Sequence, residues 1–87
     1  MKLAEQVRST HNQDGAVVLD ILHGEIYRLN VIGSHIFRCL QQGFTESQIS
    51  QEISSLYNLE AGIAAVDVRE FLSVLEQRDL VHKVHQA

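Results

Sequence analysis

The side chains best suited to catalysis or metal binding in this chain are five histidines and one cysteine. The histidines are scattered along the sequence, at His11, His23, His35, His82 and His85. Metal sites in proteins are usually recognised in a sequence by closely spaced ligands, such as CxxC or HExxH. Neither pattern occurs, and no carboxylate cluster completes a ligand set. The sequence therefore predicts no metal site.

The single cysteine, Cys39, would need a nearby base to act as a nucleophile. It follows Arg38 on a predicted helix and lies between Ile36 and Leu40, which we expect in the core. A buried thiol is chemically inert. The chain also lacks a glycine-rich phosphate loop and a serine-triad pattern. We therefore predict that the protein is not an enzyme and uses no cofactor.

Length and composition limit the architecture. A chain of 87 residues is expected to form one domain, residues 1–87, with one small core. Its net charge of −4 gives no reason to expect nucleic acid as a partner. The N-terminal segment has no apolar run of signal-peptide type, and no segment approaches the roughly 20 apolar residues of a membrane span. We expect a cytoplasmic protein that does not contact membranes, in agreement with its lone cysteine.

The helices and strands that must position any site begin with the segment 14–30, DGAVVLDILHGEIYRLN. It predicts a hairpin, with strands at 16–22 and 25–29 joined at His23-Gly24, where glycine supplies a positive φ. A third strand is predicted near 3–9, and residues 10–15 are predicted to form a loop. The strand 25–29 then has no partner on one edge. Proteins either protect such an edge or use it.

Three helices are predicted to follow. Asn30 is expected to cap the first, which runs from 31 to about 42, and Thr45 with Gln48 forms a capping-box pattern at the start of the second. The second is predicted to end near Asn58 and the third to run from 60 or 61 to 78, before a short extended tail at 80–84. The expected core positions are Ile32, Ile36 and Leu40, then Ile49, Ile53, Leu56 and Tyr57, and finally Ala64, Val68, Phe71, Leu72 and Leu75.

This order predicts an α+β fold of winged helix-turn-helix-like type, with a three-stranded antiparallel sheet followed by three helices (βββααα). The third helix has a second apolar sector, formed by Ile63, Val66 and Val74 and interleaved with acidic residues. One interpretation is that this sector packs on the sheet or on a chain terminus. The other is that it forms one wall of a groove, in which an extended peptide pairs with the open strand edge.

The segments DGAVVLDILHGEIYRLN and VIGSHIF, followed by AAVDVREFLSVLEQRDLV, resemble the PqqD-like family. These are the leader-peptide recognition elements of pathways that make ribosomally synthesised and post-translationally modified peptides (RiPPs). The resemblance extends from about Asp14 to Val81 and depends on the order and spacing of the segments. One departure is Phe37, where many members have tryptophan.

The resemblance implies a non-catalytic protein that captures the leader of a precursor peptide as an added antiparallel strand between the third strand and the third helix. It would then present the leader to a separate leader protease or other modifying enzyme, with a lasso-peptide pathway as the first choice. The residues implied for peptide binding are Glu25, Ile26, Tyr27, Arg28 and Leu29 on the strand, and Val66, Asp67, Glu70, Phe71, Val74 and Arg78 on the helix.

Each of these residues also has a purely structural interpretation. Tyr27 and Leu29 would be core residues and not ligand contacts. Asp67 would form a local cap or ion pair. Arg28 and Arg78 would be solvated surface charges, whereas on the peptide-binding interpretation they would meet acidic residues of the leader.

Two other functions remain open from the sequence. Winged-helix proteins often bind DNA, but the third helix carries Asp67, Glu70 and Glu76 against Arg69 and Arg78, a balance unsuited to phosphate contacts. A small adaptor that dimerises by pairing strand edges is the other alternative.

Overall fold

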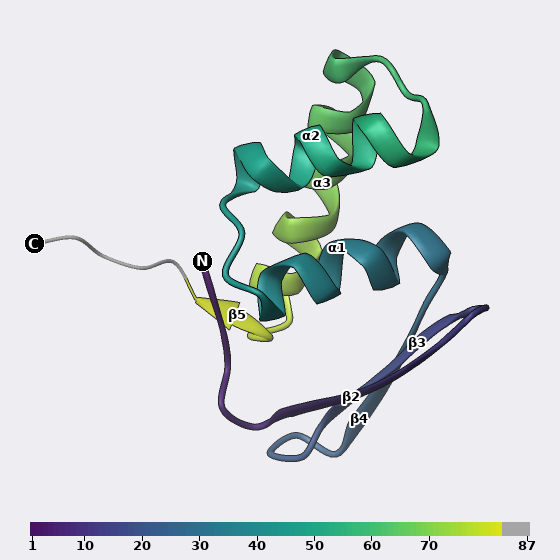
Figure 1. Cartoon of the computed structure of the whole chain (residues 1–87). Coiled ribbons are helices and arrows are strands. Elements are labelled where there is room, and N and C mark those ends of the chain that lie inside the picture. The colour runs from purple at the N-terminus through teal and green to yellow at the C-terminus, as the bar shows by residue number, and fades with distance from the viewer. Residues whose placement is uncertain (83–87) are drawn as a thin grey trace, which may run out of the picture.

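The computed structural model describes residues 1–82 (Figure 1). Its helices are α1 (Val31–Gln41), α2 (Glu46–Tyr57) and α3 (Ala61–Gln77), and its strands are β1 (Lys2–Leu3), β2 (Val7–Asn12), β3 (Gly15–Asp20), β4 (Glu25–Leu29) and β5 (Val81–His82). In Figure 1, α1 lies between the sheet and α2, and α3 runs from the level of α2 down to the level of α1. The predicted α+β fold, a three-stranded antiparallel sheet followed by three helices, is confirmed.

The main sheet has the order β2-β3-β4, and both of its strand pairs are antiparallel. Side chains alternate across it, so that Ala16, Val18 and Asp20 of β3 are buried while Leu19 is exposed. Val18 pairs with Tyr27, and both face the helices. The buried face holds the sheet on α1, and the other face of β3 and β4 is left to solvent.

The strand predicted at 3–9 was wrong in position. The structure pairs Val7–Asn12 with β3, whereas Lys2–Leu3 forms a separate short strand with β5. The predicted loop at 10–15 is correspondingly shorter, because residues 10–12 continue β2. The sequence VRSTHN has polar residues on both faces, so its period-two pattern is weak even though alternate side chains are partly buried.

The turn between β3 and β4 begins earlier than predicted, because β3 ends at Asp20. Asp20 Oδ1 accepts a hydrogen bond from the His23 backbone N–H at 3.1 Å, and Asp20 Oδ2 lies 2.6 Å from His23 Nδ1. Gly24 has a φ of 66°, as the sequence predicted for this turn. Residues 21–24 therefore form a turn held by one buried carboxylate.

The helix boundaries agree with the predicted caps. Asn30 Oδ1 accepts a hydrogen bond from the Gly33 N–H at 2.8 Å, and Thr45 and Gln48 form a capping box. Leu56 was predicted in the core but is 55 % exposed, because it lies beyond the face that α2 turns to α3. Phe71 is only half-buried, unlike its predicted companions on α3.

The core forms where α1 packs on the sheet and on the other helices. Phe37 is fully buried and is joined there by Val18 of β3, Ile53 of α2 and Leu72 of α3. The β1–β5 pair closes the domain beside it, with Leu3 opposite Val81. The predicted extended tail at 80–84 is described only to residue 82; Val84 and His85 lie outside the described residues.

Candidate functional site

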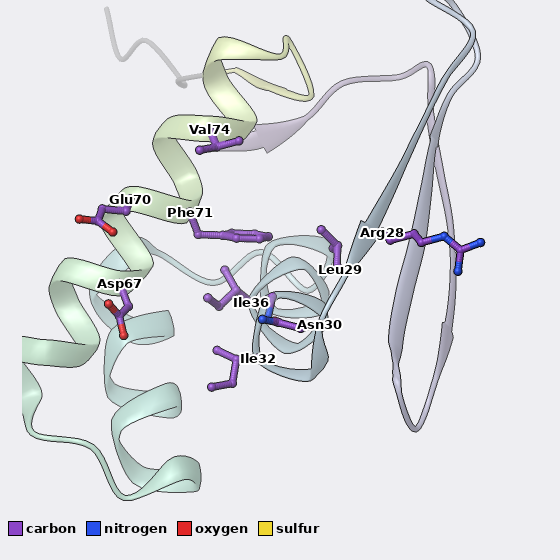
Figure 2. Close-up of a pocket in the computed structure, with 10 residues that line it drawn as sticks. Arg28, Leu29, Asn30, Ile32, Ile36, Asp67, Glu70, Phe71 and Val74 are labelled. Atoms are coloured by element: carbon purple, nitrogen blue, oxygen red, sulfur yellow. The ribbon is translucent and has the colours of Figure 1, made fainter.

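A groove of about 450 Å³ lies between β4 and α3, and the start of α1 forms its floor (Figure 2). It runs beside β4, which is an outer strand of the sheet and has no further strand paired to it within residues 1–82. The residues that line the groove are Arg28, Leu29, Asn30, Ile32, Gly33, Ile36, Asp67, Glu70, Phe71 and Val74.

The floor of the groove is positioned by the junction between β4 and α1. Asn30 ends the strand and caps the helix, so the first turn of α1 starts directly below the strand edge. Gly33 in that turn allows Phe71 to approach closely: a Cβ at position 33 would lie 2.9 Å from Phe71 Cε2. The spacing between α1 and α3 therefore depends on the missing side chain at Gly33.

The far wall of the groove is α3. Figure 2 shows the Phe71 ring extending from α3 toward Leu29 of β4, above Ile36 of α1. Val74, one turn further along α3, is 50 % exposed and also lines the groove. Asp67 and Glu70 add exposed carboxylates to this wall. The groove thus combines an apolar interior with a negatively charged rim.

The structure brings together a part of the residues expected to bind peptide. Arg28, Leu29, Asp67, Glu70, Phe71 and Val74 all line the groove. The Arg28 guanidinium nevertheless points away from the groove in Figure 2, because neighbouring side chains of a strand face opposite sides and Leu29 faces the groove.

The other expected residues lie outside the groove lining. Ile26 is 65 % exposed on the outer face of the sheet, and Val66 is 56 % exposed on α3. Tyr27 and Arg78 meet one another, with the guanidinium carbon 5.6 Å from the centre of the Tyr27 ring. This cation–π contact spans from β4 to the end of α3. Glu25, at the start of β4, is exposed.

The sequence analysis missed the contribution of α1 to the groove, made by Asn30, Ile32, Gly33 and Ile36. Asn30 was interpreted only as a cap, and the two isoleucines only as core residues. A signal for them was present, because a helix that follows an edge strand without a linker must begin beside that edge. Gly33 in a first helical turn was a second signal, since glycine there invites a close neighbour.

Cys39 and His11 do not line this groove. Burial, together with the nearby charge of Glu52, raises the pKa of the Cys39 thiol, as expected for an inert cysteine. His11 Nδ1 is 3.0 Å from Ser34 Oγ, but Ser34 is buried where β2 packs on α1. Burial and the charge of Arg38 lower the pKa of His11. This network therefore joins β2 to α1.

The turn at the other end of β4 carries an ion pair between Asp20 and His23, 2.6 Å apart. Burial opposes ionisation of Asp20, but the hydrogen bonds and charge of His23 outweigh it and lower the pKa of Asp20. The hydrogen bond to Asp20 and the charge of that carboxylate raise the pKa of His23. Within residues 1–82 there is no group of three or more His, Cys, Asp or Glu side chains suited to holding a metal ion.

Known proteins match this chain in sequence pattern and in shape. The family coenzyme PQQ synthesis protein D (PqqD) matches residues 15–81. The structure of TbiB1 in complex with the TbiA(beta) leader peptide superposes with a TM-score of 0.91, at 28 % identity, over 99 % of this chain and 100 % of that one. The structure of lasso peptide synthetase B1 complexed with the leader peptide superposes with a TM-score of 0.84, at 23 % identity, over 94 % of this chain and 96 % of that one. No curated protein matches the sequence.

Proposed function

The chain belongs to the PqqD family, and we propose that it is a non-catalytic protein that binds the leader segment of a ribosomally made precursor peptide. The observation that carries this proposal is the apolar groove beside the unpaired edge of β4. The similarity to TbiB1, whose structure holds a leader peptide, supports it. No helix within residues 1–82 is long and apolar enough to cross a bilayer.

The leader would add to β4 as an antiparallel strand. An added strand alternates its side chains, so every second residue would enter the groove between β4 and α3. Backbone hydrogen bonds contribute only about 1 kcal/mol each after exchange with water, and ordering the peptide offsets much of that. Large apolar side chains of the leader must therefore supply affinity, and Phe71, Val74 and Ile32 offer them an apolar surface.

The bound leader would be presented to a separate enzyme. We propose that residues 1–87 act as one recognition domain in the cytoplasm, beside a leader protease or another modifying enzyme that cuts or alters the precursor. A lasso-peptide pathway is the first choice. Both leader-bound structures described above superpose on this chain over almost its full length, and one of them is a lasso peptide synthetase B1.

The experiment that tests this proposal is a titration of isotopically labelled protein with the leader half of a short precursor encoded beside it. Saturable amide shifts are expected at Glu25–Leu29 and in α3 from Asp67 to Val74, with little change in β2. Absence of shifts with the cognate leader would overturn the proposal. Perturbation of the same amides by duplex DNA, or by raising the protein concentration alone, would favour the DNA-binding or the dimeric alternative instead.

A further inference from the structure

The face of the sheet that points away from the helices carries a second apolar surface. Two cross-strand rows form it: Arg8, Leu19 and Ile26 lie side by side in one row, and Thr10, Val17 and Arg28 in the next. We call these six residues the outer face. Its members come from β2, β3 and β4, and their side chains alternate with those that face the core.

The centre of the outer face is apolar and open. Leu19 is 38 % exposed and Ile26 is 65 % exposed, and they line a depression of about 220 Å³ together with Arg8, Thr10 and Val17 of the outer face. The turn that follows β3 also carries two exposed apolar residues, Ile21 and Leu22, which are 56 % and 72 % exposed but do not line the depression. Contiguous apolar surface of this kind on a small protein marks an interaction site more often than a scatter of single residues does.

The charges around this apolar centre indicate what would cover it. The outer face contains two arginines at opposite corners and no acidic residue, although the chain as a whole has a net charge of −4. A complementary surface would present apolar side chains surrounded by carboxylates. A second copy of the outer face is disfavoured, because the interface would then contain four arginines and no acidic residue of the outer face to offset them.

The outer face is also continuous with the proposed leader site through β4. The strand turns Leu29 toward the groove and Ile26 and Arg28 outward. A leader strand added to its edge would extend both outer rows by one residue, since its alternate side chains would stand beside Ile26 and Arg28. A protein that covers the outer face would therefore stand next to the bound leader.

We propose that the outer face is the docking surface for the separate enzyme that acts on the precursor, and that this enzyme binds it through an apolar patch bordered by aspartate or glutamate residues. This inference rests on the proposed leader-binding function, since it takes the leader's processing enzyme as the partner. It assigns the two sides of β4 to different ligands: the groove side binds the leader, and the outer side binds the enzyme.

The test measures enzyme binding and leader binding separately on the same variants. The probe is the purified enzyme encoded beside the precursor, titrated by calorimetry into the full chain loaded with leader. Leu19→Asp is expected to weaken enzyme binding about tenfold or more, and Arg8→Glu severalfold, because each places a negative charge opposite the proposed carboxylates. Both should leave leader affinity within about twofold, since neither residue lines the groove.

Leu56→Asp is the matched control, because Leu56 is also an exposed leucine but lies on α2, away from the sheet. It should change neither affinity. In the unaltered protein, bound enzyme should slow hydrogen exchange at amides of residues 17–19 and 26, which keeps the test decisive if Leu19→Asp does not fold.

Unchanged enzyme binding by Leu19→Asp and Arg8→Glu, protection elsewhere, or no enzyme binding at all would overturn the inference while leader binding stands. Self-association through these residues, detected as a concentration-dependent mass, would overturn it too. Loss of leader binding by the unaltered protein would instead reject the proposed function.

Discussion

The two outer strands of the sheet, β2 and β4, offer the same backbone hydrogen-bonding groups but have different surroundings. Within residues 1–82 neither has a strand paired to its outer edge. The groove adjoins β4 alone, because α1 begins directly after it and α3 crosses nearby, and no residue of β2 lines that groove. An unpaired edge is therefore not enough to define a peptide site; the helices beside it make the difference.

The largest expected effect comes from changing the α3 wall. Val74→Asp should weaken leader binding about 10- to 100-fold, because it buries a carboxylate against an apolar peptide side chain. Val66→Asp is the matched control: Val66 is 56 % exposed and Val74 50 %, both on α3, but only Val74 lines the groove. Fluorescence anisotropy with a labelled leader measures both. Equal losses of leader affinity in the two variants would show that the groove is not the binding site. Leader-induced shifts of the β2 amides would show that the peptide does not distinguish the edge of β4 from the edge of β2.

A smaller effect is expected from the floor. Gly33→Ala should weaken leader binding by roughly 5- to 20-fold, because the new methyl group would push Phe71 from its place or move α3 outward. Gly62→Ala provides the control, since it is also a glycine in a helix but has open space around it. That substitution should raise the thermal midpoint slightly without changing affinity. If Gly33→Ala binds leader normally, the close contact with Phe71 does not shape the site.

The contact between Arg78 and Tyr27 should matter less. Arg78→Gln removes a cation–π interaction worth about 0.5–1 kcal/mol, which corresponds to a two- to fivefold loss of leader affinity if the contact fixes the end of the groove. Arg8→Gln alters an arginine on β2 and should have no effect on leader affinity. An equal response of the two variants would indicate a general effect of charge.

The smallest effect concerns pH and the turn that leads into β4. Asp20 raises the pKa of His23, so this contact stabilises the folded protein fully at pH values below 6.5, the ordinary pKa of histidine. The stabilisation is lost as the pH rises through the raised pKa of His23. The lowered pKa of Asp20 stabilises the folded protein at pH values above 3.8, the ordinary pKa of aspartate. That stabilisation is lost as the pH falls through the lowered pKa of Asp20. The pair should therefore contribute most between these two pH values.

Thermal midpoints of the unaltered protein and of His23→Gln, measured from pH 3 to 9, check this expectation. The difference between the two proteins should be largest near pH 5 and should shrink toward alkaline pH. A difference that does not vary with pH would mean that the ion pair adds nothing to the neutral hydrogen bond.

The sequence predicted the helices better than the sheet. Caps such as Asn30 and Thr45 are local, so they can be identified from a few neighbouring residues, and both are confirmed. The first strand was misplaced because its partner, β3, and not its own weak alternation sets its position. Leu56 was placed wrongly in the core, since helical periodicity gives a face but not the width of the surface that covers it.

The groove was also predicted only in part from the sequence. Its β4 and α3 walls were expected from the resemblance, and the structure places Leu29, Phe71 and Val74 together there. The contribution of α1 was missed although its start directly after β4 was a local signal; only the neighbour of Gly33, Phe71, could not be identified, because the two lie far apart in the sequence. Contacts of that kind depend on the whole fold, which the pattern of either segment alone does not reveal.

The distance along the chain between the groove's walls also bears on how the protein responds to its ligand. Leu29 and Phe71 face one another only after α3 has docked, whereas the strands of the sheet pair with close neighbours in sequence. A leader that touches both walls binds only the folded state, and it therefore stabilises the protein against unfolding. At a free concentration of 100 times its Kd it would add about 2.7 kcal/mol to the free energy of unfolding. Heat resistance would then report occupancy of the groove.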